Sequence, residues 1–443
     1  MTIVKQFAKK GLTTFQRLRN RIAYESRCRK VPGVNLGQHQ HVLIITVDCL
    51  RNDRISRTGY QRETTPFLDS MNSFTPAIAA APWTFSSVPS ILTGLYPHHH
   101  GATYTDDSSR NQDLTNPPNG VRDDVYTVAE LLGASGYETK FITSIGTAAV
   151  PIQGRFKFME QHHDVDAETM LSELQQWWNS EAGPKFGYVQ LGDLHEPLHE
   201  PEQMYFDEVP DIEGIDRWRF TAGDTQSEEF EDYRSARGLL YDTLVRYVDE
   251  QIKQTFKELI DIEKTVVIVT SDHGEEFWEY KSFEEEYFED SRGISGVGHG
   301  HALVPPVIEV PIATNIEGIP TLESRRSLTD IVPTIFRELE ANLSINFDGH
   351  PLQDRSAAGE PVLSEEIAYG PNQISVTDGD DHLIYVPMDD RSVLIDFESG
   401  EVTTDPELEQ QLLEYIPRER ETGTSVDISP DTQEQLSDLG YTE

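Results

Sequence analysis

The stretch TVVIVTSDHGE, residues 265–275, passes from a run of apolar and β-branched residues to a polar turn. Its first six residues predict a β-strand that is buried on both faces, as in a parallel sheet. Asp272 and His273 follow immediately where this strand ends. In open α/β sheets, ligands bind at the carboxyl ends of the strands. The stretch therefore predicts a core strand that carries two potential metal ligands to a binding edge.

Two further stretches repeat this pattern. HVLIIT at residues 41–46 leads to Asp48, and FGYVQL at residues 186–191 leads to Asp193 and His195. Apolar residues at helical spacing lie between these strands, at 127–135, 167–179, about 233–260 and 329–339. Strands that alternate with helices indicate an α/β sandwich, with a mostly parallel central sheet flanked by helices.

Changes in composition divide the chain into four parts. We expect a basic amphipathic segment at 1–35, the main α/β domain at 40–345, a small α+β subdomain at 346–420 and an acidic tail at 421–443. Strand patterns at 382–386 and 392–397, joined by a turn, predict antiparallel pairing in the subdomain.

The chain has 36 lysines and arginines against 77 aspartates and glutamates, a net charge of −41. Too few basic residues are available to contact nucleic-acid phosphates, so no nucleic acid is expected as a partner. Aromatic residues make up 9% of the chain, which excludes general disorder. Such acidity is typical of enzymes from an extreme halophile. The acidic runs at 228–232 and 284–289 are interpreted as solvated surface.

The first 31 residues differ, with nine basic residues and one acidic residue. Their apolar residues recur at helical spacing, which allows two interpretations: peripheral contact with an anionic membrane or a partner, or a helix packed on the acidic body. No apolar run is long enough to span a membrane, and no signal-peptide pattern is visible. Two cysteines, Cys28 and Cys49, make no disulfide framework. We therefore expect a cytoplasmic location, peripheral to the membrane in the first interpretation.

The stretch APWTFSSVPSILTG, residues 81–94, is rich in hydroxyl groups and leads into a helical pattern. The N-terminus of a helix directs free N–H groups and a partial positive charge toward an anion. A hydroxyl at that position, beside a metal ion, can attack phosphorus or sulfur. The alternative is a Ser/Thr helix cap without chemistry.

Four segments together resemble the sulfatase family of the alkaline phosphatase superfamily. They are Asp48 with LRND at 50–53, WT at 83–84 through LTGLYP at 92–97, HEP at 195–197, and SDHGE at 271–275 followed by GHGH at 298–301. The resemblance covers about residues 40–340 and implies the fold and the ester chemistry of that family.

The resemblance also identifies departures from the family pattern. Ten residues before the glycine of LTG, where the family has a cysteine or serine converted to formylglycine, stands Thr84. Ser86 and Val88 replace the proline and arginine of the conversion motif, so no formylglycine is expected. Cys49 follows Asp48, which reduces the family's pair of N-terminal acids.

Carried over by position, the resemblance implies a site for one divalent cation made by Asp48, Thr84, Asp272 and His273. The ligand chemistry leaves Ca²⁺, Mg²⁺, Mn²⁺ and Zn²⁺ open. Thr84 is the expected nucleophile and His195 its catalytic partner. Arg51, His299 and His301 are the expected substrate-binding residues.

The expected activity is metal-dependent hydrolysis of sulfate or phosphate esters by a threonine nucleophile. The substrate would be an anionic small-molecule, glycan or lipid ester. Two alternatives stay open: transfer of the phospho or sulfo group to a glycan or lipid acceptor, and binding of anionic glycans without catalysis. A second metal held by Asp193 and His195, and a supporting role for Glu275, are further options.

Overall fold

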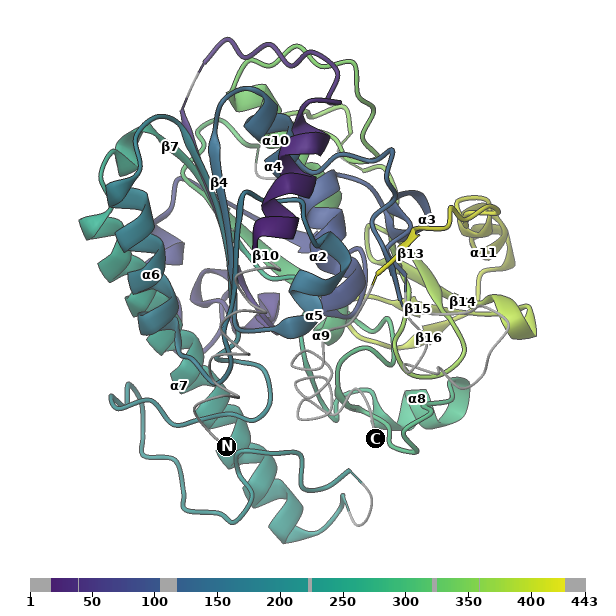
Figure 1. Cartoon of the computed structure of the whole chain (residues 1–443). Coiled ribbons are helices and arrows are strands. Elements are labelled where there is room, and N and C mark those ends of the chain that lie inside the picture. The colour runs from purple at the N-terminus through teal and green to yellow at the C-terminus, as the bar shows by residue number, and fades with distance from the viewer. Residues whose placement is uncertain are drawn as a thin grey trace, which may run out of the picture.

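The structure is a computed structural model that describes residues 17–38, 40–103, 118–221, 225–320, 325–357 and 359–426. An eight-stranded sheet with the order β11-β2-β10-β7-β1-β6-β4-β5 forms its centre (Figure 1). The strands are β1 (His41–Val47), β2 (Ser73–Ile78), β4 (Glu138–Thr143), β5 (Phe158–Gln161), β6 (Lys185–Leu191), β7 (Thr265–Thr270), β10 (Glu309–Thr314) and β11 (Arg326–Ser327).

The three predicted strands are confirmed and lie side by side at the middle of this sheet. β1 runs parallel to β6 on one side and to β7 on the other. β10 is antiparallel to both of its neighbours, β7 and β2. The sheet is therefore mostly parallel, as the sequence predicts, with its antiparallel strand toward one edge.

Helices cover both faces of the sheet. α6 and α7 lie on one face, and α2, α4 and α10 lie on the other (Figure 1). The helices are α2 (Thr84–Thr93), α3 (Pro97–His100), α4 (Val128–Ala134), α5 (Gly146–Ala149), α6 (Ala167–Ser180), α7 (Glu228–Glu258), α8 (Lys281–Tyr287), α9 (Pro305–Ile308), α10 (Ile331–Glu338) and α11 (Pro406–Leu413).

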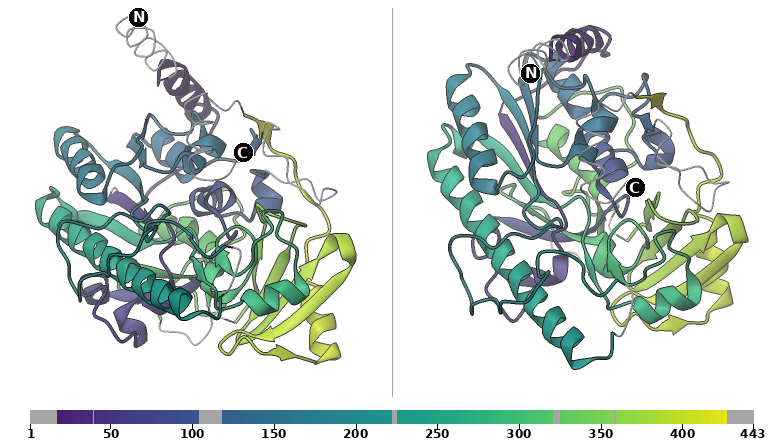
Figure 2. Two further views of the ribbon diagram at one scale, coloured as in Figure 1. Left: turned by 90° about the horizontal axis from the view of Figure 1, so that it is seen from below. Right: turned by 60° about the horizontal axis from the view of Figure 1, so that its bottom comes forward.

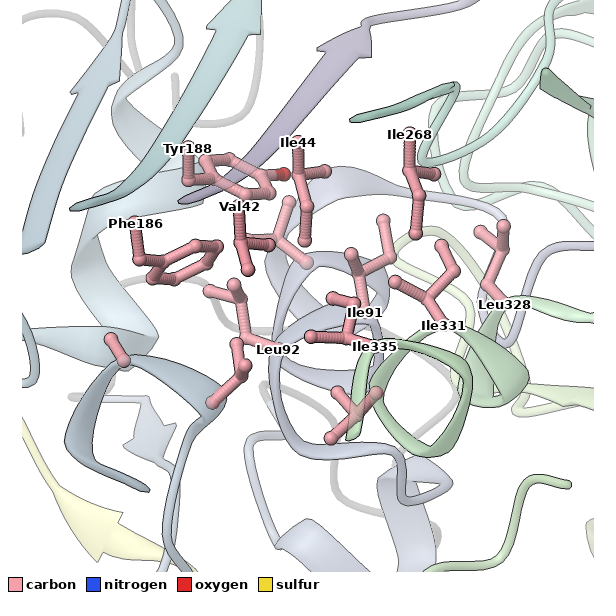
Figure 3. Packing of buried hydrophobic residues seen from close by; sticks show 14 of the residues in the cluster. Val42, Ile44, Ile91, Leu92, Phe186, Tyr188, Ile268, Leu328, Ile331 and Ile335 are labelled. Carbon is pink, nitrogen blue, oxygen red and sulfur yellow. The ribbon is translucent and has the colours of Figure 1, made fainter. Parts of the chain in front are cut away.

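Alternate residues of each central strand enter different cores. Val42 and Ile44 of β1 pack toward α2 and α10, as Figure 3 shows, whereas Leu43 and Ile45 pack toward α6 and α7. Both sets are fully buried. This double burial explains why the strand sequences are continuously apolar.

α7 begins at Glu228, earlier than the predicted start near residue 233. The Ser227 side chain caps it by accepting a hydrogen bond from the Phe230 amide, and three glutamates occupy its first turn. Acidic side chains stabilise the positive end of a helix dipole. The acidic run at 228–232 is thus the first turn of a helix, and its Phe230 is buried.

A five-stranded antiparallel sheet forms the C-terminal subdomain. Its strands, in sheet order, are β12 (Val362–Glu365), β13 (Ile374–Asp378), β14 (Asp381–Val386), β15 (Arg391–Asp396) and β16 (Val402–Thr403). β14 and β15 are the predicted antiparallel pair. Two small sheets pair β3 (Asn119–Gly120) with β17 (Thr424–Ser425) and β8 (Glu276–Phe277) with β9 (Val297–Gly298). Residues 427–443 of the predicted acidic tail lie outside the described residues.

Residues 17–28 of the basic segment are helical and lie at the periphery (Figure 2). Tyr24 is buried, its hydroxyl donates to the Ala129 carbonyl at 3.2 Å, and Arg27 pairs with Glu130. One face of the helix is therefore packed on α4. Leu18 and Ile22 are exposed, and contact with an anionic membrane stays a prediction. Residues 1–16 lie outside the described residues.

Within the described part of the chain, no helix has the length and apolar character needed to cross a membrane.

Candidate active site

The carboxyl ends of β1 and β7 bring Asp48 and Asp272 to the same level of the sheet. Thr46 of β1 pairs with Thr270 of β7, and each aspartate comes two residues later. The Asp48 amide donates to the Leu191 carbonyl at 2.9 Å, which fixes the turn after β1 against the end of β6. Both carboxylates are completely buried.

Thr84 completes the group from the other side, as the first residue of α2. Its hydroxyl donates to Asp48 Oδ2 at 3.2 Å and lies 3.1 Å from His273 Nε2. That nitrogen is also 3.6 Å from an oxygen of each aspartate. The structure thus brings together all four residues predicted as metal ligands. We call them the Thr84 centre.

The geometry of the Thr84 centre fits a divalent cation. His273 Nδ1 lies 2.9 Å from the Gly274 carbonyl, so it carries the proton and leaves the Nε2 lone pair facing the centre. Ligands held at 2.0–2.1 Å in a tetrahedron are about 3.3 Å apart. His273 Nε2 lies 3.1 Å from the Thr84 hydroxyl and 3.6 Å from one oxygen of each aspartate, close to that value.

The charges of the Thr84 centre also favour a bound cation. Burial, together with the charge of Asp48, raises the pKa of Asp272 to about 7. Burial also opposes ionisation of Asp48, but His273 and the neighbouring histidines hold its pKa below the ordinary value. Two buried carboxylates beside one imidazole require additional positive charge if both are to ionise. A cation held by Asp48, Asp272, His273 and Thr84 would supply it.

Gln190, in β6, links the two carboxylates, and the sequence analysis missed it. Its Nε2 donates to Asp48 Oδ2 at 3.1 Å and to Asp272 Oδ2 at 2.9 Å. The Tyr188 hydroxyl donates to Gln190 Oε1 at 2.8 Å and orients the amide. The feature of the sequence that could have identified Gln190 is its amide side chain within the otherwise apolar stretch FGYVQL.

His299 and His195 lie next to the Thr84 centre. The His299 ring centroid is 4.3 Å from that of His273 and 5.0 Å from that of His195. His299 Nδ1 is 3.2 Å from Glu275 Oε1 and 3.6 Å from Cys49 Sγ. Burial lowers the pKa of His299 to about 4. Cys49, His273 and His299 also form a group of metal-type donors within 4.8 Å of one another.

Arg51 is held by protein carboxylates. Its guanidinium donates to both oxygens of Asp53 at 2.8 and 2.7 Å and to Glu279 at 2.8 Å, and it is almost fully buried. It also donates to the Glu275 carbonyl at 3.0 Å. These contacts fasten the loop after β1 to the segment after β7. Arg51 therefore has a positioning role that the sequence analysis did not anticipate.

His301 lies apart from His299, although only one residue separates them. Its Nε2 is 3.2 Å from Glu276 Oε2 and 3.1 Å from Glu284 Oε1. Contact with these carboxylates outweighs burial and raises the pKa of His301 to about 10. The expectation that residues 284–289 are solvated surface is wrong for Glu284, which is buried because its side chain points from α8 toward His301.

Asp193 does not join His195 in a metal-type group among the described residues. Its Oδ1 accepts a hydrogen bond from the Ala167 amide at 3.0 Å, at the start of α6. Burial raises the pKa of this carboxyl to about 7.

Solved structures with this fold include esterases and a transferase. The phosphonate monoester hydrolase of Agrobacterium radiobacter is 16% identical, with a TM-score of 0.61 over 90% of this chain and 95% of that one. A 2-O GAG sulfatase is 16% identical, with a TM-score of 0.60 over 85% and 90%. The C-terminal periplasmic domain of a phosphoethanolamine transferase from Campylobacter jejuni is 15% identical, with a TM-score of 0.51 over 72% and 95%.

Comparison with curated protein sequences finds no match. The family model described as "Sulfatase" matches residues 40–337, which include every residue of the Thr84 centre as well as His195 and His299. The chain belongs to the sulfatase family.

Proposed function

We propose that this protein is a metal-dependent hydrolase of sulfate or phosphate esters that uses Thr84 as its nucleophile. The observation that carries the proposal is the position of the Thr84 hydroxyl. It lies at the N-terminus of α2, within 3.2 Å of both Asp48 and His273. Asp48, Asp272, His273 and Thr84 would hold the cation. When bound, a divalent cation supplies positive charge to the ester oxygens and favours ionisation of a coordinated hydroxyl.

In the first step, Thr84 and the start of α2 have different roles. Thr84 Oγ attacks the phosphorus or sulfur in line, forming one ester bond while the bond to the alcohol oxygen breaks. The proton of Thr84 leaves to solvent or a neighbouring base, and the departing alcohol oxygen takes up a proton. The amides at the start of α2 point toward the charge that develops on the transferred group.

His195 and His299 are placed to bind the anionic group or to protonate the leaving oxygen. The His299 ring lies between those of His273 and His195 in the chain of ring contacts, and Glu275 contacts His299 Nδ1. Water then releases the group from Thr84. We leave Arg51 and His301 out of the substrate-binding set, because protein carboxylates already hold both side chains.

What solved relatives bind supports an anionic substrate class. One solved relative is in complex with its substrate D-glucosamine-2-N,6-O-disulfate, and another is a phosphoethanolamine transferase domain. An anionic glycan or lipid ester therefore suits this fold. Transfer to a glycan or lipid acceptor remains the alternative to hydrolysis, because both begin with the same covalent intermediate on Thr84.

The test compares Thr84→Ala with the wild type on aryl sulfates, aryl phosphates and aryl phosphonates. Mg²⁺, Ca²⁺, Mn²⁺ and Zn²⁺ are supplied in turn, in concentrated salt. We expect activity to fall by more than about 1,000-fold, because the attacking atom is removed. Thr93→Ala is the matched control. Thr93 ends the same helix, and its buried hydroxyl donates to the Pro89 carbonyl at 2.7 Å.

Full activity of Thr84→Ala would refute the assignment of the nucleophile. Wild-type protein that shows neither a burst nor turnover with any metal would instead favour a glycan binder without catalysis. Mass spectrometry of Thr84 after quenching, with and without an added glycan or lipid acceptor, separates hydrolysis from transfer.

A further inference from the structure

A second group of metal-type side chains is buried in the structure and includes His301, two residues after His299. Glu276 comes from β8, Glu284 from α8 and His301 from the segment after β9. Their exposed fractions are 0%, 3% and 2%, and one donor atom of each lies within 4.8 Å of the others. We call these three residues the Glu276 group.

The donor atoms of the three residues converge, with the His301 imidazole between the two carboxylates. His301 Nε2 lies 3.2 Å from Glu276 Oε2 and 3.1 Å from Glu284 Oε1. The Glu284 oxygen is buried and faces His301 Nε2, and that contact falls outside hydrogen-bond geometry. An ion with ligands at 2.0–2.1 Å would separate them by about 3.3 Å, close to both distances.

Backbone amides fix the other oxygen of each carboxylate. The Tyr280 amide donates to Glu276 Oε1 at 2.8 Å, and the Gly296 amide donates to Glu284 Oε2 at 2.5 Å. Each glutamate therefore presents its remaining oxygen in a fixed direction. Ligands of bound metal ions are commonly oriented by such outer hydrogen bonds.

The Glu276 group is separate from the Thr84 centre. Glu275 contacts His299, whereas its neighbour Glu276 contacts His301. Glu275 directly precedes β8 and Glu276 begins it, and their side chains reach different histidines. Gly300 has φ 75°, so the chain turns between the two histidines.

We propose that Glu276, Glu284 and His301 bind a second divalent ion, Zn²⁺, that fixes the segment carrying His299. One imidazole nitrogen and two carboxylate oxygens are ligands that Zn²⁺ accepts, with water in the fourth position. The ion would tie α8 and β8 to residues 299–301. This proposal does not depend on Thr84 being the nucleophile.

The experiment measures zinc per chain by elemental analysis. Protein stripped with a chelator is loaded with Zn²⁺ and passed through a desalting column in concentrated salt. We expect two ions in the wild type, one in Glu284→Gln and one in His301→Asn. Glu285→Gln is the matched control, because this exposed neighbour in α8 pairs only with Lys281 among the contacts described for it, and it should keep two ions.

Asp272→Asn leaves the Glu276 group unchanged. Its zinc content therefore cannot reflect a folding defect caused by altering that group. It removes a ligand of the Thr84 centre and should retain one ion, with thermal unfolding still shifted upward by Zn²⁺. A wild type that binds one ion, with none left in Asp272→Asn, would overturn the proposal. So would a folded Glu284→Gln protein that still binds two. If Thr84 is not the nucleophile, the turnover results will differ from those expected, but the zinc content of the wild type and of these variants will not.

Discussion

At the scale of single residues, Gln190 decides how the two aspartates of the Thr84 centre stay together. Its amide donates to one oxygen of each carboxylate, and it carries no charge that would compete with a cation. A lysine in this place would neutralise one aspartate and weaken the case for a metal. The choice of a neutral donor thus supports a centre that retains its negative charge for a bound ion.

Replacing Gln190 with leucine should weaken the Thr84 centre without removing a ligand. We expect the affinity for the activating cation to fall about 10- to 100-fold, the usual cost of losing an orienting partner of a metal ligand. Metal titration monitored by activity and by calorimetry measures the change. Tyr188→Phe is the graded control, because it removes only the hydrogen bond that orients Gln190, and its effect should be smaller. Unchanged metal affinity in Gln190→Leu would contradict this role.

Their positions at strand ends pointed to Asp48, Asp272 and His273, and the resemblance to the sulfatase family pointed to Thr84. The sequence could not point to Gln190 or Glu284 in the same way. Gln190 lies within an apolar strand, and its partners come from β1 and the turn after β7. Glu284 stands in a run of acids that resembles surface, and only the packing of α8 buries it.

At the scale of elements, the prediction succeeded for the three continuously apolar strands at the centre of the sheet and failed for strands on either side of them. β1, β6 and β7 agree with their predicted ranges to within one residue. β2 and β10 were missed, since each contains a proline, and Pro76 and Pro311 lie opposite one another in the register. Proline normally argues against a strand in the interior of a sheet.

An ion pair between two elements should make the free energy of unfolding depend on pH. His162, after β5, has its Nε2 2.7 Å from Glu173 of α6, and Lys140 of β4 donates to the same carboxylate at 2.6 Å. Contact with His162, and with Lys140, lowers the pKa of Glu173 to about 2, while contact with Glu173 raises the pKa of His162. The raised histidine pKa stabilises the fold below about pH 6.5 and loses its effect as the pH rises through the folded value.

The glutamate contributes above about pH 4.5 and loses its effect only as the pH falls toward 2. His162→Ala should therefore reduce the free energy of unfolding most between about pH 4.5 and 6.5, by less than about 1 kcal/mol because the pair is partly exposed. Urea unfolding at about pH 5.5 and pH 8.5, at one salt concentration, measures this. His163→Ala, at the exposed neighbouring position, is the control. An equal loss at both pH values would rule out the ion pair as its source.

At the scale of the whole molecule, buried ion pairs consume several of the few basic residues. Arg51 pairs with Asp53 and Glu279, and Arg326 pairs with Asp330, all with the arginine almost fully buried. Basic side chains used in this way cannot offset the carboxylates at the surface. The excess of 41 negative charges is therefore concentrated on the outside, where like charges repel one another.

This distribution predicts that salt stabilises the folded state. At 1 M salt the screening length is about 3 Å, against about 10 Å at 0.1 M, so repulsion between surface carboxylates largely disappears. The Arg326–Asp330 ion pair is buried and should be screened much less. The midpoint of thermal unfolding and the turnover of an anionic substrate should both rise from 0.1 to about 2 M KCl. Sucrose of matched osmolality is the control for exclusion of solute from the surface. A midpoint that falls with KCl, or rises equally with sucrose, would show that repulsion among surface carboxylates does not limit the stability of this fold.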